Sequence, residues 1–137
     1  GELPEGSNWE GAAAAAHHKV DNIVVFNDIN GLQISGDTSK VMDMEPIADK
    51  WEAFGWSVKT VDGNDMAEIV EALDAAPFEK GKPSVIIGKT IKSKGLSFAE
   101  DNAAYHHWAP TKVEGQLEQA IRELDDKIAE LEKEVAK

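Results

Sequence analysis

The feature that most constrains the fold is an alternation of short strand-like runs with stretches of helical apolar spacing. Ile23 to Phe26 and Ser84 to Ile87 are rich in β-branched residues, and Ser57 to Val61 is a third predicted strand. The wholly apolar run Ile23 to Phe26 is typical of a strand buried on both faces of a parallel sheet. Between the predicted strands, Glu45 to Phe54 and Asp65 to Ala75 have helical spacing. The order predicts an α/β fold, with a parallel sheet and helices on both faces.

A further helix is predicted at each end of this region. Ser7 and Glu10 have the spacing of a capping box, which predicts a helix running to about Lys19. Near the other end, apolar residues recur from Leu117 at spacings of four and three, with charged residues between them. This heptad stripe predicts a C-terminal amphipathic helix, either in a short coiled coil or packed on its own domain. Its members are Leu117, Ile121, Leu124, Ile128, Leu131 and Val135.

Composition excludes several classes of protein. The 26 acidic and 14 basic residues give a formal net charge of -12, which argues against a surface for nucleic acid or anionic membranes. With no cysteine, the chain has neither disulfides nor thiolate metal sites. No apolar stretch is long enough to span a bilayer, and no signal segment opens the chain. We therefore expect a soluble cytoplasmic protein whose 137 residues form no more than one domain.

Two unusual segments follow the first and third predicted strands, Asn27 to Gly36 and Lys89 to Pro110. In open parallel sheets, ligands bind beyond the carboxyl ends of the strands, so both segments should lie at the edge where a ligand sits. The second segment clusters lysines, among them Lys92, in an otherwise acidic chain. This clustering predicts an anionic ligand.

Sequence motifs in these regions resemble a known family. The chain opens Gly1-Glu-Leu-Pro-Glu-Gly-Ser-Asn-Trp-Glu10, and later reads Asp28-Ile-Asn-Gly-Leu-Gln-Ile34, Lys89-Thr-Ile-Lys-Ser-Lys-Gly95 and Tyr105-His-His-Trp-Ala-Pro110. Together they are similar to transketolases, which use thiamine diphosphate. Gly1 resembles the last glycine of the Gly-Asp-Gly motif of such enzymes, so we expect an upstream polypeptide that carries the aspartate. The resemblance covers Gly1 to about Pro110.

The resemblance implies a metal site and a cofactor site. Magnesium, or calcium in its place, would take oxygen ligands from the Asn30 side chain, the Leu32 carbonyl and the aspartate before Gly1. The implied cofactor-binding residues are Gly1, Glu5, Asn30, Ile34, Ile91 and Lys92.

Each of these residues has a role in the family pattern. Gly1 would let the backbone approach the phosphates, Ile34 and Ile91 would pack on the cofactor, and Lys92 would lie near the diphosphate. In the family, the position of Glu5 lies in a subunit interface that couples paired active sites. His106 resembles the catalytic histidine that handles the hydroxyl protons of the sugar substrate.

The implied activity is that of a transferase which moves a two-carbon ketol unit from a ketose phosphate to an aldose phosphate. Residues 1–111 would be the C-terminal part of a diphosphate-binding domain, and residues 112–137 an amphipathic helix. The glutamate that activates the cofactor ring is not in this chain, so activity would require a pyrimidine-binding, C-terminal transketolase subunit. A split-gene transketolase forming a dimer of heterodimers has this organisation.

Other interpretations remain open at the sequence level. His107 stands where the family usually has glycine, and Asn27-Asp28-Ile29 is an unusual lead into Asn30. Taken alone, Asn30-Gly31 is a turn signal and Lys92 a solvated lysine. One functional alternative is a related thiamine diphosphate enzyme with another substrate, such as a deoxyxylulose phosphate synthase or a sulfosugar transketolase. The other is a non-catalytic assembly module with an incomplete metal site.

Two further groups of side chains are assigned no chemistry. His17 and His18 are expected near a helix C-terminus, where partial positive charge is favourable. The tryptophans Trp9, Trp51 and Trp56 are expected in the core.

Overall fold

A computed structural model of the chain describes residues 1–109 and 113–136. It divides into two compact units, Gly1–Thr90 and Ile91–Lys137. The domain boundary predicted between residues 111 and 112 lies outside the described residues, as does Pro110 of the last motif. That boundary stays a prediction.

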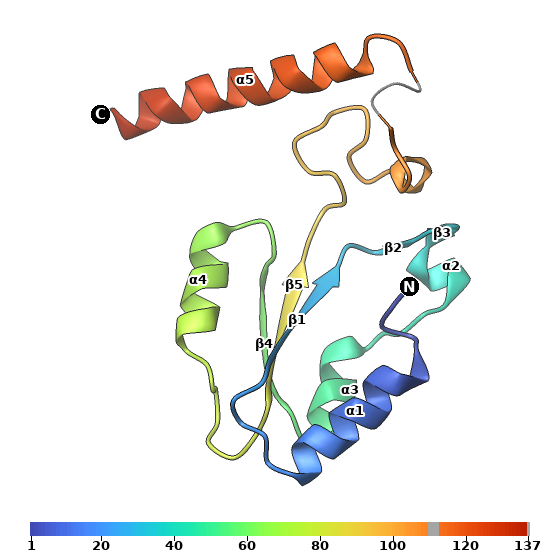
Figure 1. The fold of residues 1–137 in the computed structure, drawn as a ribbon, viewed down its shortest axis with the longest axis vertical. Coiled ribbons are helices and arrows are strands. Elements are labelled where there is room, and N and C mark those ends of the chain that lie inside the picture. Colours follow the sequence, from blue (N-terminus) through green and yellow to red (C-terminus); the bar gives the residue numbers. More distant parts are fainter. Residues whose placement is uncertain (110–112, 137) are drawn as a thin grey trace. The chain divides into compact units, whose positions relative to one another are not determined.

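The first unit is built on a three-stranded parallel sheet (Figure 1). Its strands are β1 (Val24–Ile29), β4 (Ser57–Asp62) and β5 (Ser84–Lys89), in the order β1-β5-β4. Ser84 at the start of β5 is in register with Val24 on one side and Ser57 on the other. All three carboxyl ends therefore meet at one edge of the sheet, which confirms the predicted α/β fold.

Helices cover both faces of this sheet (Figure 1). On one face lie α1 (Gly6–His17) and α3 (Ile47–Ala53), and on the other lies α4 (Met66–Asp74). Alternate side chains of β5 explain the two layers, because successive residues of a strand point to opposite faces. Val85 and Ile87 join the core beneath α1 and α3, whereas Ile86 joins the core beneath α4.

The core on the α1 side is aromatic, as predicted. Trp51 is 3% exposed and Trp56 is 5% exposed, and their ring centroids are 4.8 Å apart. Trp9 packs against them, with its ring 5.2 Å from that of Trp51. The Trp56 indole donates a hydrogen bond to the carbonyl of Ala12 at 2.9 Å, which fastens α1 to the sheet.

The neighbouring strands β1 and β5 differ in burial. Ser84–Gly88 of β5 is buried on both faces. In β1, by contrast, Val24 and Phe26 are both 40% exposed, so the prediction of a strand buried on both faces is wrong there. The reason is topological, because β5 occupies the middle of the sheet while β1 pairs on one side only among the described residues.

Helix ends follow the sequence signals only in part. The N-cap of α1 is Glu5 without a side-chain hydrogen bond, so the capping box predicted at Ser7 is wrong. The helix ends at His17, with His18 as its C-cap, which confirms the expected place of these histidines. Asp65 caps α4 by accepting from the main-chain N–H groups of the second and third residues that follow it.

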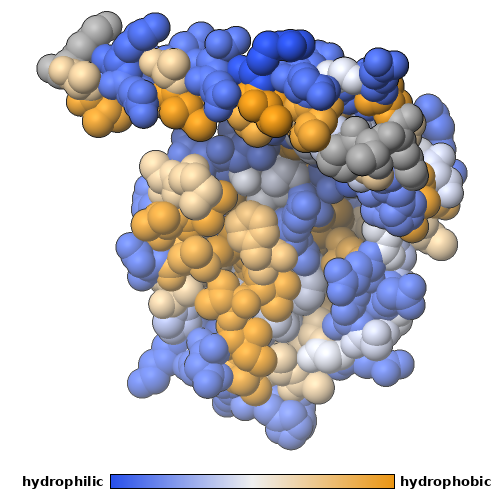
Figure 2. Space-filling model, turned by 45° about the horizontal axis from the view of Figure 1, so that its top comes forward, coloured by the Kyte–Doolittle hydropathy of each residue, from blue (hydrophilic) through white to orange (hydrophobic). Residues whose placement is uncertain are grey.

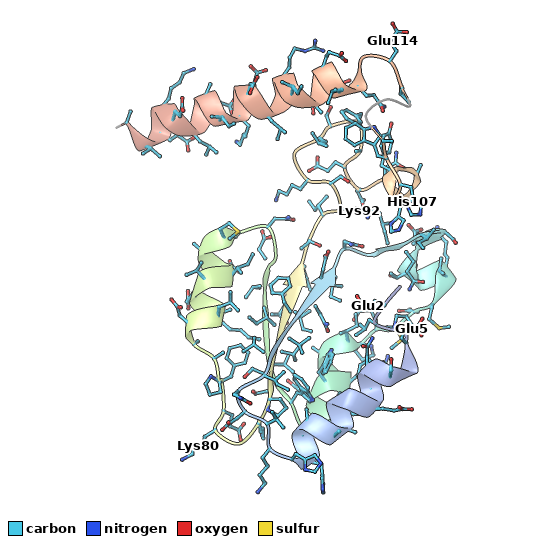
Figure 3. All side chains as sticks on the ribbon, viewed as in Figure 1. Glu2, Glu5, Lys80, Lys92, His107 and Glu114 are labelled. Carbon is cyan, nitrogen blue, oxygen red and sulfur yellow. The ribbon has the colours of Figure 1, made fainter. Side chains whose placement is uncertain are left out.

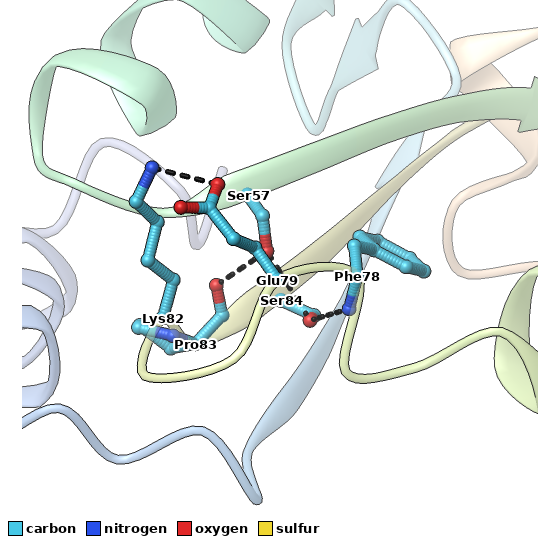
Figure 4. Close-up of polar contacts among 6 residues, drawn as sticks. All are labelled: Ser57, Phe78, Glu79, Lys82, Pro83 and Ser84. Carbon is cyan, nitrogen blue, oxygen red and sulfur yellow. Dashed lines mark hydrogen bonds and ion pairs between the residues drawn. The ribbon is translucent and has the colours of Figure 1, made fainter.

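Polar contacts fix the amino end of the sheet (Figure 4). The fully buried hydroxyl of Ser84 accepts from the main-chain N–H of Phe78 at 3.1 Å. The hydroxyl of Ser57 lies 3.4 Å from that of Ser84 and donates to the carbonyl of Pro83 at 3.1 Å. These bonds satisfy the buried polar groups at the edge opposite the predicted site.

Shorter elements complete the two units. In the first unit, a hairpin of β2 (Leu32–Gln33) and β3 (Gly36–Asp37) follows β1 and leads into α2 (Thr38–Val41). The second unit contains the 3-10 turn η1 (Ala103–Tyr105) and the predicted C-terminal helix, α5 (Gln116–Val135). Within residues 1–109 and 113–136, no helix is long and apolar enough to cross a membrane.

Candidate functional site

The carboxyl end of β1 turns sharply at Asn30 and Gly31. Asn30 Oδ1 accepts a hydrogen bond from the N–H of Leu32 at 3.0 Å, and Gly31 has a φ of 72°. A positive φ favours glycine, and an asparagine side chain that bonds two residues onward is a common turn device. The turn fixes the direction of the Asn30 amide oxygen. That oxygen has a second lone pair, so turn and ligand are compatible roles.

Three of the predicted site residues lie together at this turn. Gly1, Asn30 and Leu32 line one cavity of about 90 Å³. A side chain added at Gly1 would meet no atom within 4 Å, so the space beside its backbone is open. The oxygen atoms here belong to an amide side chain and to main-chain carbonyls, and magnesium and calcium both bind such oxygen ligands. The residues present therefore fit the implied cation.

The other predicted residues of the first unit lie elsewhere. Ile34 is 64% exposed in the hairpin, so the described residues leave most of this apolar side chain uncovered. Glu5 is exposed at the N-cap of α1, close to Glu2 (Figure 3). Nothing in its contacts within the chain identifies a ligand for it.

Two polar residues of β1 support this turn, a role that the sequence analysis did not assign to them. Asp28 accepts a short hydrogen bond from the hydroxyl of Thr90, and Asn27 Oδ1 accepts from the indole N–H of Trp51 at 2.6 Å. The N–H of Thr90 also donates to the carbonyl of Ile29 at 3.2 Å. Polar residues placed just before the end of a strand were the available signal. They lock β1 to its neighbours immediately before Asn30.

The described residues contain no cluster of side chains that would bind a cation without main-chain or amide oxygens. In the described part of the chain, no three His, Asp or Glu side chains converge as a metal-binding group.

The second unit carries Ile91, Lys92 and His106. The carbonyl of Lys92 accepts from the N–H of Asp101 at 3.0 Å, which closes the loop between them. His106 follows η1, and its ring centroid lies 4.5 Å from that of His107. Partial desolvation lowers the pKa of His106 below its ordinary value of 6.5, and the positive charges of His107 and Lys92 lower it further.

The first turns of α5 hold the loop that bears His106. Gln116 accepts from the indole of Trp108 at 2.9 Å and donates to the hydroxyl of Tyr105 at 2.8 Å. Glu123 accepts from the N–H and the hydroxyl of Ser97, at 2.8 and 2.5 Å. The Ser97 hydroxyl is the main reason that the pKa of Glu123 is below its ordinary value. These loop-holding residues were not predicted, because only contacts between distant segments reveal them.

The sequence matches one family over nearly its whole length. Residues 1–130 match the family described as the transketolase, thiamine diphosphate binding domain. The chain belongs to this transketolase family. The resemblance drawn from the motifs is thereby confirmed.

Proteins named as transketolase subunits are among the relatives of this chain. It is 42% identical, over 98% of its length, to the A subunit of the apulose-4-phosphate transketolase of Phocaeicola vulgatus. It is also 42% identical, over 99% of its length, to the 6-deoxy-6-sulfo-D-fructose transketolase subunit SqwG of a Clostridium species. The chain spans about half the length of these relatives, since it covers 47% and 46% of them.

Solved transketolases have the same fold. The transketolase of Campylobacter jejuni superposes with a TM-score of 0.72 at 35% identity, over 77% of this chain and 16% of that one. This similarity agrees with the parallel sheet and its helices on both faces. The assignments of individual site residues remain predictions, which the geometry above makes specific.

Proposed function

We propose that this chain is the thiamine-diphosphate- and magnesium-binding part of a transketolase, which transfers a two-carbon ketol unit between a ketose phosphate and an aldose phosphate. The observation that carries the proposal is the Asn30 turn, whose amide oxygen is oriented by Leu32 N–H in a cavity shared with Gly1. Membership of the thiamine diphosphate binding domain family supports it.

In this proposal, the first unit holds the cation and the diphosphate. Asn30 Oδ1 and the carbonyl of Leu32 are the two ligands from this chain, and the backbone of Gly1 makes room for the phosphates. Asp28 and Asn27 keep the turn in place through their bonds to Thr90 and Trp51. Such supporting bonds hold a ligand in one geometry and so strengthen its binding.

The second unit supplies cationic and proton-transferring side chains. When bound, thiamine diphosphate provides the carbon nucleophile and the electron sink for breaking a carbon–carbon bond. Lys92 attracts the anionic groups of cofactor or substrate. His106, whose pKa is lowered, is neutral at pH 7 and can therefore accept a proton from a sugar hydroxyl. Ile34 and Ile91 pack on the apolar parts of the cofactor, and Glu5 contributes to the subunit interface that couples paired sites.

We further propose that a second, pyrimidine-binding subunit completes the enzyme, in a dimer of heterodimers in the cytoplasm. Relatives that are themselves named as transketolase subunits support a two-component enzyme. More than one ketose is a candidate substrate, because two relatives that are equally identical to this chain are named for different sugars. One is named for apulose 4-phosphate and the other for a sulfofructose. A branched or sulfonated ketose is thus a specific alternative to the ordinary pentose phosphates.

Titration calorimetry on the chain together with its pyrimidine-binding subunit tests the cofactor proposal. We expect thiamine diphosphate to bind only when magnesium is present. Asn30→Ala should weaken this binding at least about tenfold, because one ligand is lost. Asn22→Ala, the same change in the exposed turn before β1 at the opposite edge of the sheet, is the control and should bind normally. Absence of magnesium-dependent binding by the wild-type pair would favour the non-catalytic assembly module.

Ketol-transfer assays with the same pair test the substrate. Xylulose 5-phosphate, apulose 4-phosphate and a 6-sulfonated fructose should be compared as donors at equal concentration. Turnover of any one of them supports the transferase function, and their ratio identifies the substrate. A pair that binds the cofactor but turns over none would contradict the proposed reaction.

A further inference from the structure

One face of α5 carries a continuous apolar stripe that remains largely exposed. Figure 2 shows hydrophobic side chains gathered along one side of this helix and hydrophilic ones along the other. Five of the stripe residues are between 41% and 54% exposed, and Val135 is 88% exposed. They are Leu117, Ile121, Leu124, Ile128, Leu131 and Val135.

The loop of the second unit contacts a neighbouring face of the helix. Those contacts come from Gln116, Gln119 and Glu123 in the first two turns. From Leu124 to Val135 the stripe continues without a residue in either hydrophobic core of the described residues. This second half therefore presents apolar side chains that something else can cover.

The choice of residues in the stripe favours a particular partner. In heptad terms, Ile121, Ile128 and Val135 occupy the a positions, and the three leucines occupy the d positions. β-Branched residues at a with leucine at d favour a parallel, two-stranded coiled coil. Charged residues flank the stripe closely from Asp125 on. So narrow a stripe is typical of a coiled-coil seam, whereas a helix packed on a globular core has a wider apolar face.

Charges beside the stripe select the orientation. Lys127 is at a g position and Glu132 at the following e position. In a parallel pair of identical helices, Lys127 of each copy faces Glu132 of the other, so two interhelical salt bridges form. In an antiparallel pair, e positions face each other, which would set Glu118, Asp125 and Glu132 against acidic residues. In the single chain Lys127 forms an ion pair with Glu130 at 3.4 Å, and both side chains are exposed, so Lys127 can change partner by rotating its side chain.

We propose that α5 forms a parallel two-stranded coiled coil with α5 of a second copy of this chain. Pairing along Leu124 to Val135 leaves the bonds that hold the His106 loop intact, because these lie at or before Glu123. The helix starts of both copies lie at one end of the coil, so both loop-bearing segments are held together there. This interface is independent of cofactor binding and goes beyond the proposed function.

Sedimentation equilibrium of the full chain, with charge-reversal variants, tests the pairing. We expect a reversible dimer. Lys127→Glu and Glu132→Lys should each weaken dimerisation about tenfold, because each sets like charges in two facing pairs. The two changes alter net charge in opposite directions, so a shared effect identifies the pair rather than overall repulsion. The double variant should dimerise like the wild type.

A matched control uses the outer face of the same helix. Lys133→Glu changes the charge as Lys127→Glu does, but position f points away from the seam, so the dimer should be unchanged. Circular dichroism of each variant confirms that α5 is still helical. A wild-type monomer, or a dimer that neither single reversal weakens, overturns the proposal, because the stripe is then covered by its own domain or by another protein.

An engineered cysteine tests the orientation in a protein that has none. In the parallel coil, Val135 of one copy faces Val135 of the other, so Val135→Cys should oxidise to a disulfide-linked dimer. Lys133→Cys on the outer face should not cross-link. If Val135→Cys fails to link copies that still dimerise, the parallel arrangement is wrong.

Discussion

The close approach of Gly63 to the central strand makes a sharp prediction about stability. Gly63 follows β4, and its N–H donates to the carbonyl of Lys89 at 2.8 Å. A Cβ added there would lie 2.5 Å from Cγ2 of Thr90 and 3.0 Å from both the carbonyl carbon and the Cα of Gly88. The central strand is paired on both sides and cannot move away. We therefore expect Gly63→Ala to cost about 1–3 kcal/mol of unfolding free energy through overpacking.

Gly11 provides a control with the opposite expected sign. It lies inside α1, where an added Cβ would meet nothing within 4 Å. Alanine is a better helix former than glycine, so Gly11→Ala should stabilise the protein by about 0.5–1 kcal/mol. The same methyl group thus has opposite effects at two positions, for reasons that only the surroundings supply.

Urea unfolding followed by tryptophan fluorescence measures both variants. The midpoint should fall for Gly63→Ala and rise for Gly11→Ala, with the slope m unchanged, since the surface exposed on unfolding is the same. Thr90 holds Asp28, so Gly63→Ala should also disturb the Asn30 turn and weaken magnesium-dependent cofactor binding. A Gly63→Ala protein as stable as the wild type would refute the reasoning, because β4 and β5 would then not be rigidly packed at this edge.

Two further predictions concern pKa values in the second unit. Desolvation and nearby positive charge lower the pKa of His106. Lys92→Met should therefore raise this pKa, because removing a positive charge favours the protonated imidazole. An unchanged titration of His106 by NMR would contradict the proximity of Lys92 to His106. Hydrogen bonds from Ser97 lower the pKa of Glu123 below 4.5. The contact therefore contributes to folding stability above pH 4.5, and this contribution is lost as the pH falls through the lowered pKa. Ser97→Ala should therefore raise the pKa of Glu123, as carboxyl carbon NMR would report, and an unchanged value would show that the contact does not form in solution.

The elements themselves could be predicted where side-chain patterns dominate. Ser84 to Ile87 is predicted as a strand, and in the structure β5 is buried on both faces in the centre of the sheet. Ile23 to Phe26 is wholly apolar, yet β1 is half-exposed and continues through Asn27 and Asp28 to Ile29. Hydrogen bonding to β5 decides the length of that strand, and a local pattern cannot include a partner about sixty residues away.

The candidate site shows the same division. The motifs indicated Asn30 and Leu32, and the fold brings both into one cavity with Gly1. They did not indicate the roles of Asp28, Gln116 or Glu123, which depend on partners in other segments, such as Thr90 for Asp28. Side-chain hydrogen bonds of this kind leave no periodic signal.

By itself, the sequence determined the family, the alternation of strands and helices, and the heptad stripe of α5, because backbone periodicity and short motifs are local properties. Tertiary structure alone decided that β5 rather than β1 is the central strand, that Asn27 and Asp28 brace the Asn30 turn, and that the first turns of α5 hold the His106 loop. The physical reason is that burial and hydrogen-bond partners are fixed by contacts between segments distant in sequence. Local patterns in the sequence restrict those contacts but do not specify them.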